Sequence, residues 1–197
     1  YVLSEGRFQN RIFVTYSDQR IKELLEDERF YDREAVVYPS RDLIFYQADI
    51  HGNQLTKERI KTLRRILEVK PANVITTLSS LKAPKLYLDI WKQYLLHMDG
   101  KSIIDEKAIA LRLVEMGYEK TYQVETPGQF SVRGGIVDIF DLTEENPYRI
   151  ELWGDEIESI RSFDVMSQRS IEKLSEITVY PATEMRSEEH TSELQSQ

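Results

Sequence analysis

The first half of the chain alternates short apolar stretches with longer amphipathic ones. Residues 11–16 (RIFVTY), 35–38 (AVVY) and 73–77 (NVITT) are rich in β-branched and aromatic side chains, which is typical of buried strands. Between these stretches, apolar side chains recur every three or four positions, as they do in amphipathic helices. They are Ile21, Leu24 and Leu25 in the first interval, and Ile60, Leu63 and Leu67 in the second. The alternation of strand and helix predicts a parallel α/β sheet.

The pattern changes after about residue 84. A strand is predicted at 94–98 and a helix near 105–116, which Gly117 can end. The helix is expected to bury one face, formed by Ile104, Ala108, Leu111 and Val114. Short strands are then predicted at 129–133, 136–140, 148–153, 157–163 and 177–180. Glycine-containing turn signals such as Gly134-Gly135 separate them and predict hairpins, so this half is expected to be an antiparallel α+β domain.

Composition limits the class of protein. The chain has 197 residues and carries 26 Lys and Arg against 34 Asp and Glu, a formal charge of −8, which disfavours a nucleic-acid grip over its whole surface. Because cysteine is absent, a disulfide framework, a cysteine nucleophile and Cys-ligated metals are excluded. No apolar run is long enough for a membrane span and no signal peptide is evident, so we expect a cytoplasmic protein without a membrane partner.

Both ends suggest a piece of a longer protein. The chain opens at Tyr1 without Met and almost at once enters a predicted strand. Residues 186–197 (RSEEHTSELQSQ) contain a single aliphatic side chain, and we interpret them as a non-native tail that resembles translated sequencing-library adaptor. Without that tail, 25 Lys and Arg face 31 Asp and Glu, so residues 1–185 carry −6.

The search for catalytic chemistry gives one weak match. Gly100-Lys101-Ser102 has the last three residues of a phosphate-binding loop, but the loop also needs a glycine where Leu95 stands. A turn entering the following helix is therefore the better interpretation. The two histidines outside the tail, His51 and His97, lack a metal-ligand spacing, and the carboxylates are scattered. We expect no catalytic residue, no metal and no bound cofactor in this chain.

A basic cluster marks the second predicted helix. It consists of Lys57, Arg59, Lys61, Arg64 and Arg65. These side chains spread around the arc opposite the apolar stripe, so an ordinary solvated face is the favoured interpretation. Contact with phosphate groups stays open.

An arginine–tryptophan pair in the second half is the stronger candidate. Arg149 and Trp153 are four positions apart, so in a strand they face the same side. Arg133 ends another strand at the Gly-Gly turn. An exposed Arg–Trp pair is typical of protein-binding hot spots. The alternative, a core Trp153 with Arg149 paired to a surface acid, is equally compatible with the residues alone.

Several motifs in one order resemble a known family. They are 38–52 (YPSRDLIFYQADIHG), 124–140 (VETPGQFSVRGGIVDIF), 146–155 (NPYRIELWGD), 164–169 (DVMSQR) and 180–185 (YPATEM). The chain is similar over nearly all of residues 1–185 to the N-terminal UvrB-homology region of the bacterial transcription-repair coupling factors (Mfd). One departure from the family's pattern is Asp141, which stands where the family usually has proline.

The resemblance implies two domains. Residues 1–87 would be part of a degenerate RecA/P-loop-like parallel-sheet domain without a working phosphate loop. Residues 88–185 would be the antiparallel α+β domain that binds UvrA, together with the start of the returning segment. The family's RGG and PYRIELW motifs carry the UvrA contact, and they match Arg133, Arg149 and Trp153 here. The resemblance therefore favours the docking interpretation of the Arg–Trp pair.

The resemblance also implies a parent protein with further activities. That parent would be an ATP- and Mg-dependent DNA translocase that displaces stalled RNA polymerase, through domains absent from this chain. Its own C-terminal domains would mask the UvrA-binding face until the motor engages.

Two alternatives remain at this point. The chain could be a fragment of UvrB, which binds ATP and damaged DNA, although residues 47–54 leave no room for the DNA-clamping hairpin of UvrB. It could also be a purely structural clamp on the motor. Nucleotide binding would favour the UvrB alternative, and a UvrA pull-down would separate an adaptor from a clamp.

Overall fold

The computed structural model describes residues 10–40, 53–68, 72–82 and 91–184. The chain divides into two compact units, Tyr1–Leu86 (the first unit) and Tyr87–Gln197 (the second unit), and each is described by itself. The predictions made above for residues 42–52 and 186–197 lie outside the described residues.

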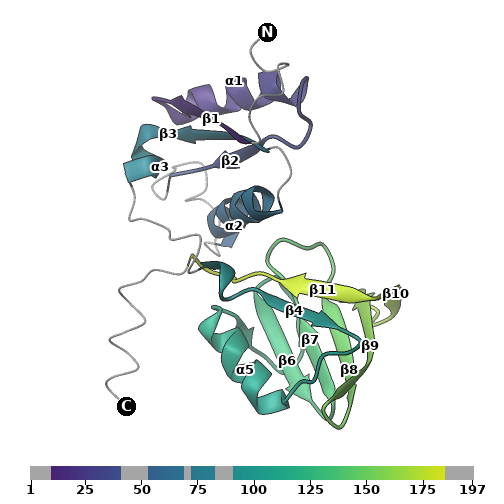
Figure 1. The fold of residues 1–197 in the computed structure, drawn as a ribbon. Coiled ribbons are helices and arrows are strands. Elements are labelled where there is room, and N and C mark those ends of the chain that lie inside the picture. Colours follow the sequence, from purple (N-terminus) through teal and green to yellow (C-terminus); the bar gives the residue numbers. More distant parts are fainter. Residues whose placement is uncertain (1–9, 41–52, 69–71, 83–90, 185–197) are drawn as a thin grey trace, which may run out of the picture. The chain divides into compact units, whose positions relative to one another are not determined.

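The first unit contains a three-stranded parallel sheet (Figure 1). Its strands, in the spatial order β1-β3-β2, are β1 (Asn10–Thr15), β2 (Val36–Tyr38) and β3 (Ala72–Thr77). Its helices are α1 (Asp18–Arg29), α2 (Asn53–Leu67) and α3 (Leu78–Lys82). Helices α1 and α2 lie on opposite sides of the sheet (Figure 1). The predicted parallel α/β arrangement is confirmed for this unit, and only the short α3 was not expected.

Local signals account for these elements. The side chain of Ser17 caps α1 by accepting a hydrogen bond from the backbone N–H of Arg20 at 3.3 Å. In α2, Ile60 and Leu63 are buried as their spacing predicts. All six residues of the central strand β3 are buried, since the strand has a neighbour on each edge and a helix on each face.

The second unit is built around a six-stranded sheet in the order β10-β9-β8-β7-β6-β5 (Figure 1). The strands are β5 (Glu119–Lys120), β6 (Gln129–Arg133), β7 (Ile136–Ile139), β8 (Tyr148–Trp153), β9 (Glu156–Phe163) and β10 (Ser170–Leu174). Helix α5 (Glu106–Glu115) covers one face, and β4 (Leu96–Asp99) pairs with β11 (Glu176–Val179) in a two-stranded sheet. Every pairing is antiparallel except that of β5 with β6. The predicted antiparallel α+β arrangement is confirmed.

Two elements of this unit were not predicted. Strand β10 is an edge strand whose residues are almost all exposed, so its sequence (SIEKL) carries no alternating apolar face. Strand β5 has only two residues and is held by its pairing with β6. Neither has a hydrophobic pattern that a sequence analysis could detect.

The prediction for the buried face of α5 was partly wrong. Ile104 is buried, but Leu111 and Val114 are 68% and 54% exposed, and Ala108 is exposed as well. The helix instead buries Ile109 and Leu113 against the sheet. The helix carries apolar side chains on more than one side, so the spacing of these residues does not identify the buried face. The position of the sheet decides which side is buried.

Two hydrophobic clusters lie on opposite faces of the six-stranded sheet. The larger one fills the face under α5 and includes Phe130, Ile139 and Ile150. The smaller one consists of Val124, Phe140 and Phe163, with Val165 against it. Because Phe163 alternates with Ile160 along β9, it belongs to the face that α5 leaves open. We call this second face the outer face.

Candidate protein-docking face

The three predicted docking residues all lie on the outer face. Ile150 and Leu152 of β8 are buried on the α5 side, so Arg149 and Trp153, at alternate positions, point to the outer side. The strand register places Arg133 of β6 opposite Ile136 of β7, which in turn lies opposite Glu151 of β8. The structure therefore brings Arg133 to the same face, two strands away from the arginine–tryptophan pair.

Glycines at the hairpin turns set this register. Gly134 and Gly135 both have positive φ (57° and 80°), as a two-residue type I′ turn requires. Gly154 (φ 63°) begins the turn after Trp153, where only the first central residue has positive φ, as in type II′. Both docking residues next to these turns, Arg133 and Trp153, are thus fixed in register by tight hairpins.

Trp153 is an exposed side chain and not a core residue. It is 79% exposed at the end of β8, while its neighbours on the other face are buried. An exposed tryptophan beside arginines has the composition that is enriched in protein-binding hot spots. The alternative interpretation of Trp153 as a core residue is therefore wrong.

Arg149 is held on all sides by its neighbours. Its Nε and Nη2 donate to the two carboxylate oxygens of Asp138 at 2.7 and 2.8 Å, and Nη2 also donates to Oε1 of Gln168 at 2.8 Å. Its guanidinium lies 4.1 Å above the ring of Phe163. The hydrogen bonds that Arg149 donates to Asp138 raise the pKa of Arg149, although burial opposes them. Arg149 is a fixed, permanently charged group whose side chain is only 15% exposed.

Arg133 is more accessible than Arg149. Its side chain is 37% exposed, and its Nη2 lies 3.7 Å from Oδ2 of Asp138. Its Nη1 donates to the carbonyl oxygen of Tyr122 at 3.2 Å, and the guanidinium lies 5.4 Å from the centre of the Tyr122 ring. Arg133 is therefore oriented by weaker contacts and keeps donors available for a partner.

Asp138 connects the two arginines and was missed by the sequence analysis. It lies on β7 between their strands and is 1% exposed, so one buried carboxylate serves both cations. A buried charge is tolerated only when it is paired. The sequence gives no sign of this role, because the pairing of Asp138 with Arg149 depends on the register of β7 and β8 across an irregular loop.

A second ion pair lies beside this group on the outer face. Glu151 pairs with Arg161 of β9 and accepts a hydrogen bond from the Ser159 hydroxyl at 2.9 Å. Burial raises the pKa of Glu151, but the hydrogen bonds from Ser159 and Arg161 outweigh it, so the pKa is lowered overall. These residues border a hollow of about 350 Å³ that extends to β10. Its charged lining is of mixed sign.

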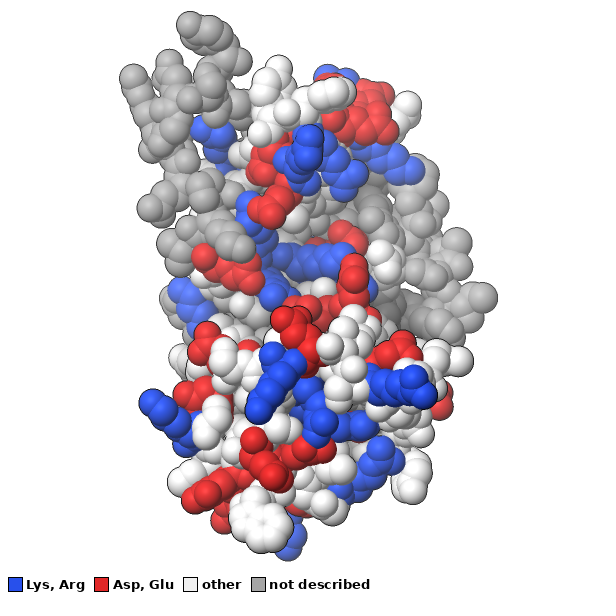
Figure 2. All heavy atoms as spheres, turned by 90° about the vertical axis from the view of Figure 1, so that its right-hand side faces the viewer, with Lys and Arg blue, Asp and Glu red and all other residues white. Residues whose placement is uncertain are grey.

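The charges on the surface are interspersed. On the face of the molecule that Figure 2 draws, blue and red side chains alternate, without a continuous basic field. Strong binding to the nucleic-acid backbone needs such a field. Interspersed charges of both signs are usual for a solvated protein surface.

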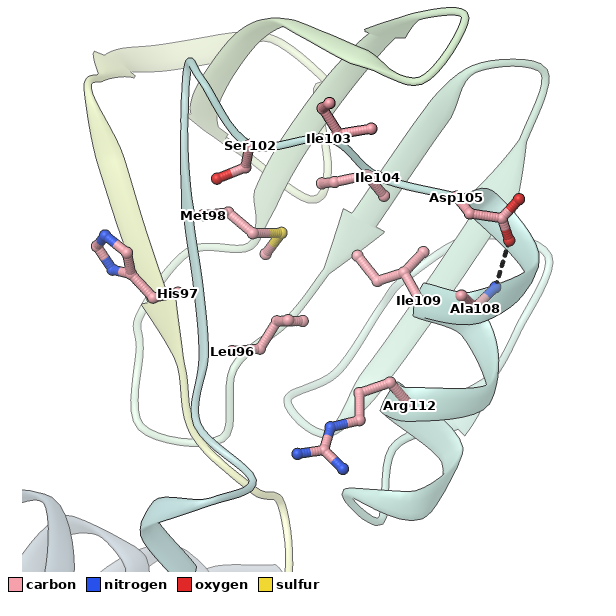
Figure 3. A pocket seen from close by; sticks show the side chains of 10 residues that line it. All are labelled: Leu96, His97, Met98, Ser102, Ile103, Ile104, Asp105, Ala108, Ile109 and Arg112. Atoms are coloured by element: carbon pink, nitrogen blue, oxygen red, sulfur yellow. Dashed lines mark hydrogen bonds between the residues drawn. The ribbon is translucent and has the colours of Figure 1, made fainter.

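A further hollow, of about 250 Å³, lies between β4 and α5 (Figure 3). Met98, Ile104 and Ile109, which line it, are buried side chains of the large hydrophobic cluster. Arg112 lies at one end and His97 points away from it (Figure 3). Without converging polar groups, the hollow has no feature of a reaction site.

The Gly-Lys-Ser motif forms the turn after β4. The carboxylate of Asp99 accepts hydrogen bonds from the Lys101 N–H at 3.0 Å and from the Ser102 hydroxyl at 2.8 Å. Helix α5 begins only at Glu106, with Asp105 as its cap. A phosphate loop leads directly into its helix, and this segment does not.

The basic helix α2 is not a uniform solvated face. Arg59 is 2% exposed, its guanidinium lies 4.0 Å from the centre of the Tyr38 ring, and it donates to the carbonyl oxygen of Pro39. The prediction of an exposed side chain at Arg59 was therefore wrong. Arg65 forms an ion pair with Glu34, with 2.7 Å between Nη2 and Oε2, and this pair connects α2 to the residues before β2.

The described residues contain neither a metal-binding cluster nor a helix that could span a membrane. Among residues 10–40, 53–68, 72–82 and 91–184, no group of three His, Cys, Asp or Glu side chains could hold a metal ion. Within the same ranges, every helix is too short or too polar to cross a membrane.

Comparison with known proteins gives a matching family and several relatives. Residues 96–185 match the UvrB interaction domain family. The transcription-repair-coupling factor of Bacillus subtilis is 37% identical over 154 residues, which are 78% of this chain and 13% of the relative. Those of Staphylococcus aureus (strain bovine RF122 / ET3-1) and Staphylococcus epidermidis are 36% and 34% identical over 157 and 153 residues, 79% and 78% of this chain. The chain spans 13% of the length of each of these relatives.

Proposed function

We propose that this chain is a non-catalytic module that docks on UvrA. The premise is that residues 96–185 belong to the UvrB interaction domain family. The chain as a whole is homologous to one part of the transcription-repair-coupling factors. The observation that carries the proposal is the exposed Trp153 on the same rigid face as Arg133 and Arg149. The three side chains supply the apolar anchor and the cations typical of a protein-binding hot spot.

Each docking residue has a separate physical role. Trp153 loses most of its exposed surface in the complex and provides the hydrophobic part of the affinity. Arg133 makes charge-assisted hydrogen bonds to acidic groups of UvrA with the donors that its own neighbours leave available. Arg149, fixed on Asp138 and Phe163, presents a charge whose position does not change on binding, so little entropy is lost there.

The wider roles that we propose concern the parent protein. That parent is an ATP-dependent DNA translocase that uses Mg and displaces stalled RNA polymerase in the cytoplasm. The part formed by this chain recruits UvrA to the parent. The C-terminal domains of the same parent cover the docking face until the motor engages. We further propose that this chain itself contributes no catalysis and binds no nucleotide. The Gly100-Lys101-Ser102 segment forms a turn and does not lead directly into helix α5.

A pull-down and titration with purified bacterial UvrA test the docking proposal. We expect Trp153→Ala and Arg133→Ala each to weaken binding by about 1–3 kcal/mol, the range for hot-spot residues. The melting temperature should stay unchanged in Trp153→Ala and fall only slightly in Arg133→Ala, because Trp153 is exposed and Arg133 is partly exposed and makes long contacts. Tyr16→Ala is a matched control, because Tyr16 is an exposed aromatic (91%) in the first unit.

The outcomes separate the competing functions. Unchanged UvrA affinity in both variants would refute the assignment of the site. No UvrA binding by the unmodified chain would favour a structural clamp. Saturable ATP binding by the chain would favour a fragment of a UvrB-type damage-recognition protein, since such a fragment keeps a working phosphate loop.

A further inference from the structure

Gln168 has an unusual backbone conformation in the turn between β9 and β10. Among the described residues, it is the one non-glycine residue with positive φ (59°). This left-handed region brings the β-carbon close to the backbone, so glycine or asparagine usually occupies it. A glutamine here is strained, and strained residues concentrate at functional sites.

Most of the bonds that close the turn do not involve the Gln168 side chain. The carboxylate of Asp164 accepts hydrogen bonds from the Ser167 N–H at 2.8 Å and the Ser167 hydroxyl at 2.6 Å. These two bonds lower the pKa of Asp164. The backbone N–H of Gln168 donates to the Asp164 carbonyl oxygen at 2.8 Å, and the Asp164 N–H donates to that of Arg169 at 2.9 Å. A glycine at position 168 would leave all of these bonds in place.

The side chain of Gln168 is used to hold Arg149. Its Oε1 accepts from Nη2 of Arg149 at 2.8 Å, and its Nε2 donates to the carbonyl oxygen of Val165 at 2.7 Å. Because both ends of the amide are bonded, its orientation is fixed. The left-handed backbone thus places an acceptor next to a guanidinium that Asp138 holds from another edge.

We propose that Gln168 is a positioning residue for the docking face, which fixes the Arg149 guanidinium in the plane that UvrA recognises. The inference rests on the proposed function and adds a residue that acts through Arg149, without touching UvrA itself. Asp138 neutralises Arg149, whereas Gln168 adds no charge and only restricts its rotation. The strained backbone is retained because it provides this restraint.

A positioning role and a purely structural role predict different changes in melting temperature and in UvrA affinity. Gln168→Gly relieves the backbone strain and keeps the backbone and Asp164 bonds of the turn. It removes the bond from the Gln168 side chain to the Val165 carbonyl oxygen, so the two effects oppose each other and the melting temperature should change little. The same substitution releases Arg149, so UvrA affinity should fall about tenfold, equivalent to about 1.4 kcal/mol. Stability and affinity are expected to move independently.

The experiment uses the complete 197-residue chain and purified UvrA. Affinity and melting temperature are measured for the unmodified chain, Gln168→Gly, Arg149→Lys and the double variant. Lysine keeps a positive charge near Asp138 but lacks the planar fork that reaches Gln168. If Gln168 acts through Arg149, Gln168→Gly should have no further effect on affinity in the Arg149→Lys background.

Two outcomes would overturn the proposal. A parallel fall in melting temperature and affinity would make Gln168 a structural turn residue. An equal loss of affinity in both backgrounds would mean that Gln168 does not act through Arg149. Trp153→Ala, measured alongside, keeps the proposals apart: if it weakens binding while Gln168→Gly does not, the docking function stands and only the role of Gln168 fails.

Discussion

At the scale of single residues, Asp138 organises the outer face. It is buried, yet it neutralises Arg149 through two hydrogen bonds and attracts Arg133 from 3.7 Å. With two arginines on one carboxylate, the group keeps a net positive charge toward the partner. The accessible cation is Arg133, and the supporting cation is Arg149.

Replacing this shared carboxylate should destabilise the second unit. We expect Asp138→Asn to lower the free energy of unfolding by about 3 kcal/mol, because it leaves the Arg149 charge poorly paired. Arg133→Ala, which removes the more exposed and more distant partner, should cost less than about 1 kcal/mol. Urea unfolding followed by tryptophan fluorescence measures both. Equal losses of stability in the two variants would contradict this prediction, because Arg133 would then contribute as much as the Asp138 carboxylate that it shares with Arg149.

Asp141 is a second buried carboxylate with a structural role. Its Oδ1 accepts bonds from the Thr143 N–H at 2.8 Å and the Thr143 hydroxyl at 2.7 Å. Its Oδ2 accepts from the Tyr180 N–H at 2.8 Å and lies 3.4 Å from the Tyr118 hydroxyl. An aspartate in place of the family's usual proline thus joins the turn after β7 to the end of β11.

The buried hydroxyl of Tyr118, next to Asp141, should make the stability of the fold depend on pH. Burial, with the nearby Asp141, raises the pKa of Tyr118 well above its usual value, so the folded chain keeps the phenol neutral. The corresponding stability is complete below about pH 10, the unfolded pKa, and is lost as pH rises beyond it. Tyr118→Phe should lose about 1 kcal/mol at pH 7, because the hydroxyl donates to the Tyr180 carbonyl oxygen at 2.6 Å.

Thermal melts from pH 7 to 11 check this prediction. The unmodified chain should lose stability above pH 10 more steeply than Tyr118→Phe does. Lysine deprotonation affects both chains equally, so the comparison isolates the phenol. Parallel curves would contradict the expected titration.

At the scale of elements, the end of α5 holds the segment that follows β11. Gly117 (φ 87°) closes the helix in a Schellman arrangement, in which the Tyr118 N–H donates to the Leu113 carbonyl oxygen at 2.9 Å. The Ala182 N–H donates to the Met116 carbonyl oxygen at 2.9 Å. The segment after β11 therefore packs on the helix terminus.

Gly117→Ala should be strongly destabilising for two reasons. An L-residue is strained at this φ, and its β-carbon would lie 2.7 Å from Cγ2 of Thr183. We expect a loss of about 2–3 kcal/mol, from the left-handed strain and the overpacking together. Gly100→Ala is the control, because no atom lies within 4 Å of its β-carbon position. Calorimetry of the two variants should show a lower melting temperature only for Gly117→Ala.

The strands were predicted correctly where hydrophobic alternation and turn-forming residues mark their ends. The alternation of β8, with the turn signals Asn146-Pro147 before it and Gly154 after it, gave the bounds Tyr148–Trp153 that the structure has. The face of α5 could not be predicted, because Leu111 and Leu113 are equally apolar and only the sheet distinguishes them. The sequence analysis placed Arg133, Arg149 and Trp153 as candidates, whereas Asp138 and Gln168 emerged only from contacts made across strands.

At the scale of the whole molecule, the docking residues and their supports belong to one unit. Arg133, Asp138, Arg149, Trp153 and Gln168 all fall within Tyr87–Gln197, which has its own hydrophobic core. A unit with its own core is expected to fold alone. The proposed UvrA contact needs no described residue of the first unit.

A fragment of residues 87–197 should therefore bind UvrA nearly as well as the complete chain. We expect a dissociation constant within about threefold, which is less than 1 kcal/mol. Titration calorimetry of both proteins makes the comparison. Loss of binding by a folded fragment, as judged by its circular dichroism, would place part of the docking surface in the first unit.

The sequence by itself determined the local features of this protein. Strand alternation, helix caps and turn glycines depend on neighbouring residues, so the parallel sheet of the first unit and the antiparallel sheet of the second could be predicted. The tertiary structure decided which side of α5 is buried, that Trp153 is exposed, and that Asp138 and Gln168 hold Arg149. These features depend on strand register and on packing between distant segments, and such contacts leave no periodic signal in the sequence.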